Sequence, residues 1–166
     1  MRRRTTTLSL LVIGLVAAVV ASASAAAGDV ARSGGVQLTL PDGWSKVVSR
    51  DTRVDDPRTL LVIGTDGVKG IDSDCQVSSY RVPSDGAVIV VIGWRDSVGG
   101  TGLLPLSAMK LRRGTFDCFA GRGAVGRLTR RDRDFQVNVM VGDRASAATI
   151  DAAFDAVKSF GLAPRA

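Results

Sequence analysis

The sequence predicts an α+β fold: a largely antiparallel β-sheet with one C-terminal α-helix packed on one face. Short apolar or alternating segments, which are typical of strands, follow one another along most of the chain and are separated by turn residues. A single segment with helical spacing of its apolar residues comes after them. Because strands and helices do not alternate along the chain, a parallel α/β sheet is not indicated.

The most apolar and β-branched segment after the N-terminus, Ala87–Trp94, is predicted to be the central strand. The turn-forming residues Pro83–Gly86 come directly before it. A short run this rich in valine and isoleucine indicates a strand that is buried on both faces. The C-terminal helix would cover one face of this strand, and only Leu103–Leu106 and Trp44 remain to cover the other face. We therefore expect a ligand groove or a partner surface first on that other face.

Ahead of the central strand, the sequence predicts two further strands and the segments that connect them. Val36–Leu40 alternates between apolar and polar residues, which indicates a half-buried strand, and Pro41–Gly43 has the composition of a turn. Thr59–Gly64 is predicted as a second apolar strand. The remaining connections are expected as loops over 50–58 and 65–74 and a short helical turn over 76–82.

After the central strand, the sequence predicts a covering or edge segment over Leu103–Leu106, a short alternating segment and a hairpin. Met109–Arg112 alternates until Gly114 interrupts the pattern. Ala124–Thr129 and Phe135–Val141 are predicted as the two arms of a hairpin with its turn over Arg130–Asp134. In the second arm, four apolar residues at alternate positions share one face: Phe135, Val137, Val139 and Val141.

The C-terminal helix is predicted from one apolar stripe. Five residues recur at helical spacing: Ile150, Ala153, Phe154, Val157 and Phe160. Ser146 is the expected N-cap residue, and Gly161 is expected to end the helix as its C′ residue.

The first 27 residues have the composition of a secretory signal peptide. Arg2–Arg4 is a basic region, Leu8–Val20 is an apolar region, and Ala21–Ala27 offers several cleavage sites between small residues. We therefore expect a signal peptide over 1–27, a flexible lead-in over 28–34, and a single α+β domain over 35–166 that is secreted or extracytoplasmic. The alternative is an uncleaved membrane anchor, because about 20 residues of this composition can span a bilayer.

The composition excludes several kinds of active site. The chain contains no histidine and no glutamate, and all 16 of its acidic residues are aspartate. Histidine-dependent catalytic triads and imidazole metal sites are therefore excluded. Asp55–Asp56 and Asp72–Asp74 lack the remainder of a calcium-binding loop, and Gly121–Gly126 matches a dinucleotide-binding pattern without the helix that should follow it. We expect no metal and no cofactor, and a glycine-rich strand that lets a neighbouring layer approach closely.

Two cysteines, Cys75 and Cys118, are the only ones in the chain. An even pair in an exported protein indicates a disulfide, and no CxxC spacing points to a redox dithiol. We therefore expect a structural bridge between them in a monomeric domain.

Positive charge is concentrated in the predicted strands after residue 109. The residues that could bind an anion are Lys110, Arg112, Arg122, Arg127, Arg130, Arg131 and Arg133. Such a face would bind anionic lipid, a wall polymer or an acidic envelope protein. The alternative is an ordinary solvated face, because Asp117, Asp132 and Asp134 lie among the cations. Too few aromatic residues accompany the cations to indicate binding of nucleic acid.

Several short motifs resemble those of a group of small, uncharacterised secreted proteins of actinobacteria. The order of the elements is also similar to that of the PsbP-like α/β/α fold. This resemblance implies no known catalytic residues. The motifs that carry it are Leu40–Trp44, Pro83–Ala87, Asp117–Phe119, Phe135–Val137 and Gly142–Ala145.

The sequence therefore favours an exported, disulfide-stabilised domain with a non-catalytic binding or structural role at the cell envelope. One alternative is a binder of anionic lipid or wall polymer that uses the basic residues between Lys110 and Arg133. A hydrolase that uses aspartates is a further, weaker alternative, because no partner residues or cleft are indicated.

Overall fold

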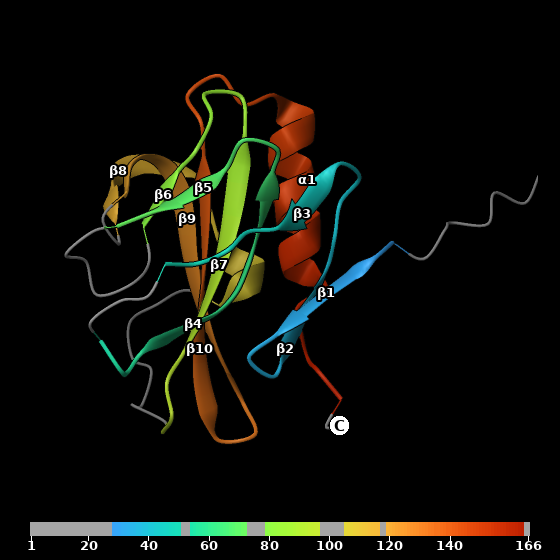
Figure 1. Ribbon diagram of the computed structural model, residues 1–166, viewed down its shortest axis with the longest axis vertical. Helices are drawn as coiled ribbons and strands as arrows, with labels where there is room; N and C mark the ends of the chain where they lie inside the picture. The colour runs from blue at the N-terminus through green and yellow to red at the C-terminus, as the bar shows by residue number, and fades with distance from the viewer. Residues whose placement is uncertain (1–27, 51–53, 73–78, 97–104, 117–118, 165–166) are drawn as a thin grey trace, which may run out of the picture.

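The computed structural model describes residues 28–50, 54–72, 79–96, 105–116 and 119–164 (Figure 1). Mostly antiparallel β-sheets with one C-terminal helix packed against them confirm the α+β prediction. Cys75, Cys118 and the expected signal peptide lie outside the described residues. The strands are β1 (Val30–Ser33), β2 (Val36–Thr39), β3 (Trp44–Lys46), β4 (Arg58–Thr65), β5 (Lys69–Ile71), β6 (Ser79–Arg81), β7 (Ala87–Gly93), β8 (Arg112–Phe116), β9 (Phe119–Arg130), β10 (Arg133–Val141) and β11 (Gly161–Leu162), and the helices are α1 (Ala147–Lys158) and the 3₁₀ helix η1 (Leu106–Ala108).

The main sheet has six antiparallel strands in the order β3-β4-β7-β10-β9-β8. Strand β7 lies inside this sheet between β4 and β10, and all seven of its residues are buried. The predicted central strand is therefore confirmed. Its valine and isoleucine side chains alternate between two apolar clusters, one on each face of the sheet.

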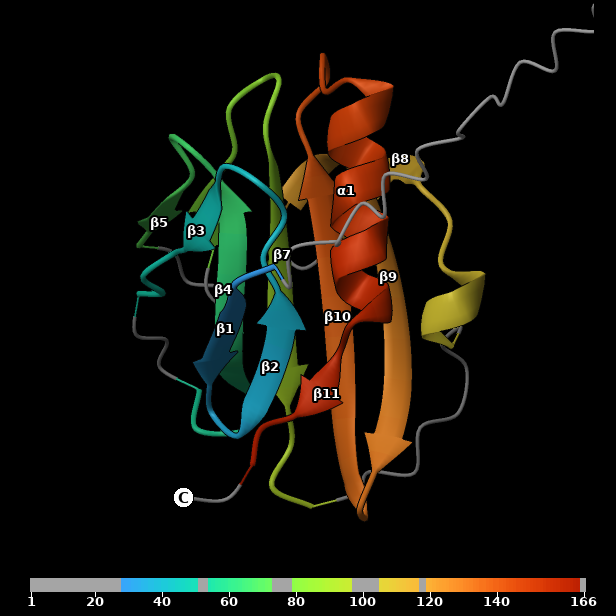
Figure 2. The same cartoon turned by 90° about the vertical axis from the view of Figure 1, so that its right-hand side faces the viewer.

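One face of the main sheet is covered by α1 and by a small sheet in the order β1-β2-β11 (Figure 2). The four alternate residues of β10 that were predicted to share a face all belong to this cluster. The apolar stripe of the helix packs on the same cluster, with Ala153 and Val157 fully buried in it. The predicted apolar face of β10 and the predicted apolar stripe of α1 are thus confirmed, and they pack against each other in one core.

The helix begins as predicted but ends earlier. The Ser146 hydroxyl accepts a hydrogen bond from the backbone N–H of Thr149 at 3.0 Å, so Ser146 is the N-cap. Ser159 forms the C-cap, and its hydroxyl accepts a hydrogen bond from the backbone N–H of Thr39 in β2. Gly161 is therefore not the C′ residue. It begins β11 instead, because pairing with Gln37 draws the chain into the small sheet.

The opposite face is covered by the hairpin of β5 and β6, not by the segments that the sequence suggested. Tyr80 of β6 packs with Val62, Val90 and Met140 in a second cluster. The loop expected over 65–74 thus contains β5, and the helical turn expected over 76–82 contains β6. Trp44 and Leu106 pack on the helix side instead, so they do not cover this face.

An α/β/α layering is not found among the described residues. Helix α1 is the only α-helix in the described ranges, and the face opposite to it carries the β5–β6 hairpin. A second difference lies near the N-terminus, where four residues of the expected lead-in form β1. Gly34 and Gly35 have positive φ angles and make a two-residue turn, which lets β1 fold back onto β2.

The predicted hairpin of β9 and β10 is present, with longer arms and a tighter turn. Arg130 pairs with Arg133, so only Arg131 and Asp132 remain in the turn. Both of these residues have positive φ angles, of 50° and 57°. A two-residue turn of this kind matches the right-handed twist of the strands that it joins. The edge strand β8 begins at Arg112, where the alternating segment Met109–Arg112 was expected to end, and it continues through Gly114, which was expected to interrupt the pattern.

Two of the motifs that carry the resemblance contact each other in the fold. The turn before β7 lies against the chain that leaves β10. The backbone N–H of Gly142 donates to the carbonyl of Gly86 at 2.9 Å, and that of Arg144 donates to the carbonyl of Ser84 at 2.6 Å. The Arg144 guanidinium also donates to the Ser84 hydroxyl at 2.8 Å. This contact fixes the start of β7 relative to the start of α1.

Candidate functional site

The structure divides the predicted basic residues between the two sides of the main sheet. Residues that face each other across antiparallel strands point to the same side. Arg122 pairs with Val141, and Arg133 lies over the ring of Phe135, so both are on the helix side. Arg112 and Arg127 point to the opposite side, since their partners are Gly123 and Gln136. Lys110 precedes β8, and Arg131 occupies the hairpin turn.

Arg127 is engaged inside the protein. Its guanidinium lies 4.8 Å from the centre of the Trp94 ring, and its Nε donates to Oε1 of Gln136 at 3.1 Å. Gln136 in turn donates through Nε2 to Oδ1 of Asn138 at 3.0 Å. Because an arginine can only donate, it fixes the orientation of both amides. Arg127 is therefore a structural residue at one end of a buried polar row.

Two of the predicted cations, Arg127 and Arg130, line a groove, and of these two only Arg130 is exposed. The groove has a volume of about 500 Å³ and lies between η1, the end of β9 and the end of α1 on the helix side. We call it the η1 groove. Its lining is Pro105, Leu106, Ser107, Arg127, Leu128, Thr129, Arg130, Val157, Lys158 and Phe160. This groove could not be predicted from the sequence, because the segments that form its three walls are far apart in the chain.

One wall of the η1 groove depends on a glycine of β9. A Cβ atom at Gly126 would lie only 2.6 Å from Cγ of Met109 and 3.0 Å from Cδ2 of Leu106. Only glycine lets the segment around η1 approach the strand this closely. The predicted role of the glycine-rich segment, as a strand that admits a neighbouring layer, is confirmed at this position.

The η1 groove combines apolar and cationic side chains. Leu106, Leu128 and Phe160 are half-buried and pack against the core. Arg130 and Lys158 are exposed. Lys158 donates a hydrogen bond to Asp155 at 2.8 Å, and this bond and the nearby negative charge raise the pKa of Lys158 above its ordinary value. Lys158 is thus positively charged at any neutral pH.

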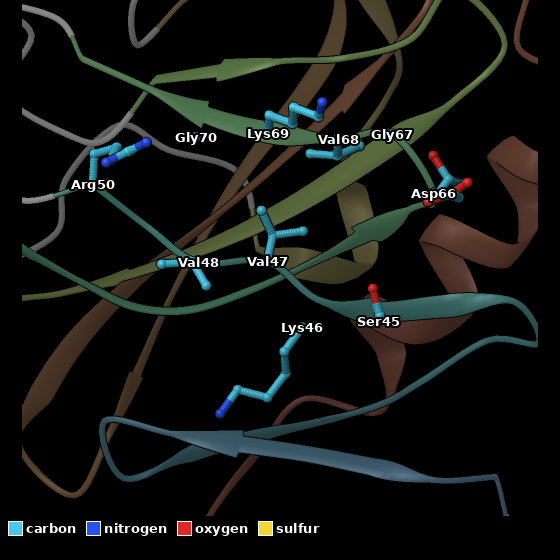
Figure 3. Close-up of a pocket in the computed structure, with 11 residues that line it drawn as sticks. Ser45, Lys46, Val47, Val48, Arg50, Asp66, Gly67, Val68, Lys69 and Gly70 are labelled. Carbon is cyan, nitrogen blue, oxygen red and sulfur yellow. The ribbon is translucent and has the colours of Figure 1, made fainter.

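A second depression, of about 470 Å³, lies at the far edge of the main sheet (Figure 3). One wall runs from Ser45 to Arg50, and the other runs from Thr65 to Gly70. The side chains of Val47 and Val68 lie between the walls, with Arg50 and Asp66 toward opposite ends. Lys46 points away, and its Nζ donates to the carbonyl of Arg32 at 3.0 Å.

The part of the chain that the structure describes contains no group of three or more aspartates or cysteines placed to hold a metal ion. No helix within the same ranges has the length and apolar character needed to cross a membrane. Asp55 and Asp56, considered above as loop carboxylates, are exposed. The backbone N–H of Arg95 donates to Oδ1 of Asp56 at 3.1 Å, which gives this carboxylate a contact within the fold.

No protein-family model matches the sequence, and a comparison with curated proteins gives no match either. The resemblance to secreted actinobacterial proteins therefore stays a prediction. The fold and the described surface define the class: a small α+β domain in which two depressions, at opposite edges of the main sheet, combine valine, leucine or phenylalanine side chains with cations.

Proposed function

We propose that this chain is an exported, non-catalytic binding domain of the cell envelope that holds an anionic amphiphile in the η1 groove. The observation that carries the proposal is the composition of the groove. Three half-buried apolar side chains lie beside two exposed cations in a volume of about 500 Å³. Sites for small ligands commonly have volumes of about 300 to 1,000 Å³ and combine an apolar lining with a few polar groups.

The same composition favours a lipid over a wall polymer as the ligand. A lipid with one acyl chain and an anionic headgroup can place its chain against Leu106, Leu128 and Phe160. Its headgroup can then contact Arg130 and Lys158. A wall polymer would use the cations but would leave the apolar residues without a partner, and exposed apolar surface is costly in water.

The test is a titration of residues 28–166 with two lysolipids. This piece contains every described strand and helix and all members of both apolar clusters. Calorimetry should detect binding of lysophosphatidylglycerol and weaker binding of lysophosphatidylcholine that has the same acyl chain. Equal binding of the two lipids would show that the cations do not contribute to binding. Binding of neither lipid would refute the proposal.

Charge reversal at the groove provides the matched comparison. The double substitution Arg130→Glu and Lys158→Glu should weaken binding of the anionic lysolipid by about tenfold or more, since each cation near an anionic headgroup contributes on the order of 1 kcal/mol. Arg131→Glu changes the charge in the hairpin turn, outside the groove lining, and should leave binding unchanged. Leu128→Asp should weaken the binding of both lipids, because it places a charge on the apolar wall.

A further inference from the structure

The most exposed large apolar side chain in the described residues lies between two cations. Val48 is 82% exposed, whereas the core valines of β7 are fully buried. Lys46 and Arg50 lie two residues to either side of it in the sequence. An isolated exposed valine is unremarkable by itself. Val48 is of interest because a further cation comes from the neighbouring strand β5.

Strand β5 adds to this site from the other wall of the depression. Lys69 begins the strand and Ile71 ends it, and side chains two residues apart point to the same side of a strand. Ile71 is 37% exposed and is another of the three large apolar side chains that stand out as exposed in the described ranges. A Cβ at Gly70 would lie 2.7 Å from the Val48 carbonyl oxygen, so the two walls are in contact there. We call the group of Val48, Arg50, Lys69 and Ile71 the β3–β5 corner; Lys46 points away from it, toward the carbonyl of Arg32.

We propose that the β3–β5 corner docks this protein onto an anionic phospholipid bilayer. Val48 and Ile71 enter the boundary between headgroups and acyl chains, while Arg50 and Lys69 contact lipid phosphates. Peripheral proteins bind such membranes through exposed apolar side chains that lie close to cations. The depression between the walls, about 470 Å³, has room for a headgroup beside the inserted side chains.

A bilayer fits the corner better than a protein partner does. Stable protein interfaces depend on a central set of large side chains, above all tryptophan, tyrosine and arginine, that fill pockets on the partner. The corner offers two aliphatic side chains and no aromatic one. A bilayer needs no such complementary shape. Binding to an anionic bilayer becomes stronger with the apolar area that is inserted and with positive charge near the membrane surface.

The residues proposed for docking at this corner differ from those proposed for lipid binding in the η1 groove. Strand β3 is at one edge of the main sheet, whereas η1 lies near strands β9 and β8 at the other edge (Figure 2). The depression at the corner and the η1 groove have no lining residue in common. Each proposal can therefore fail while the other survives.

The experiment is co-sedimentation of residues 28–166 with vesicles of phosphatidylcholine, with and without phosphatidylglycerol. Binding is expected only to the anionic vesicles and should fall as salt is raised. Lys69→Glu should weaken this binding by about fivefold or more, and Val48→Ser should weaken it without changing its salt dependence. The matched control Arg131→Glu makes the same change of charge at the hairpin turn and should bind like the wild type.

Insertion is tested separately with Val48→Trp and vesicles that contain brominated lipid. Fluorescence of the new tryptophan should be quenched beyond that of Trp44 and Trp94 in the wild type. Val48 is outside both apolar clusters, so these variants should keep the unfolding midpoint of the wild type. Equal sedimentation of Lys69→Glu and Arg131→Glu, or absence of added quenching, overturns the proposal. Lysolipid binding that persists in Lys69→Glu keeps the η1 groove proposal separate from this result.

Discussion

Substitution of Gly142 by alanine should strongly destabilise the fold, although it adds only one methyl group. An alanine Cβ at this buried position would lie closer than 3.0 Å to the carbonyl oxygens of Pro83 and Ser84. Both obstacles are backbone atoms, so no side-chain rotation can relieve the clash. The turn before β7 must move away from the end of β10.

The expected magnitude follows from the contacts that such a movement breaks. The hydrogen bonds from the N–H groups of Gly142 and Arg144 to the carbonyls of Gly86 and Ser84 each contribute about 1 kcal/mol. Strain from forcing extra volume into a packed site adds about 1 to 3 kcal/mol. Alanine restricts the unfolded chain and offsets less than about 1 kcal/mol. The net loss of stability should be about 3 kcal/mol.

Urea unfolding followed by tryptophan fluorescence measures this loss. With a slope of about 2 kcal/mol per molar urea, the midpoint of Gly142→Ala should fall by about 1.5 M. The control is Gly114→Ala in β8, where an added Cβ meets no atom within 4 Å. This variant should be as stable as the wild type or slightly more stable. Similar midpoints for the two variants would refute the argument that the Pro83–Gly86 turn is locked against β10.

Two further predictions concern the surface. Replacing Arg131 and Asp132 by asparagine and glycine should raise stability by about 1 kcal/mol in the same urea assay, because both positions have positive φ angles and asparagine followed by glycine suits this turn; a drop in stability would contradict the turn geometry. Asp155 raises the pKa of Lys158 above its ordinary value of 10.5, so the stabilisation from this pair is present below that pH and is lost as the pH rises through the raised pKa. The melting-temperature difference between the wild type and Lys158→Met should therefore shrink only above about pH 10, and a loss near neutral pH would contradict this assignment.

The strongest periodic patterns in the sequence predicted the structure well. Strand β7, the apolar face of β10 and the stripe of α1 combine long segments with uninterrupted spacing. Strands β5 and β6 were missed because each has only three residues and each includes a charged one. Three residues are too short to establish alternation, and the pairing that stabilises these strands is set by the fold rather than by local preference.

The candidate sites were less predictable than the fold. The abundance of cations after residue 109 is plain in the sequence, but the side of the sheet on which each one lies depends on strand register. Arg127 and Arg130 are three residues apart and both line the η1 groove, yet Arg127 is held against Trp94 whereas Arg130 is exposed. The groove itself requires Leu106, Leu128 and Phe160 to meet, which only the packing of η1 and α1 on β9 brings about.

The small sheet of β1, β2 and β11 joins segments that are far apart in the sequence. Strand β2 lies between the other two, and the hydrogen bond from Thr39 to Ser159 joins residues 120 positions apart. During synthesis, β1 and β2 therefore leave the ribosome long before the strand that completes their sheet exists. Until α1 has been made, Val36 and Leu38 of β2 lack the helix that packs in the same cluster, and until residue 162 has been added the edge of β2 lacks β11. The small sheet and the part of the apolar core that it covers can therefore be completed only after residue 162 has been synthesised.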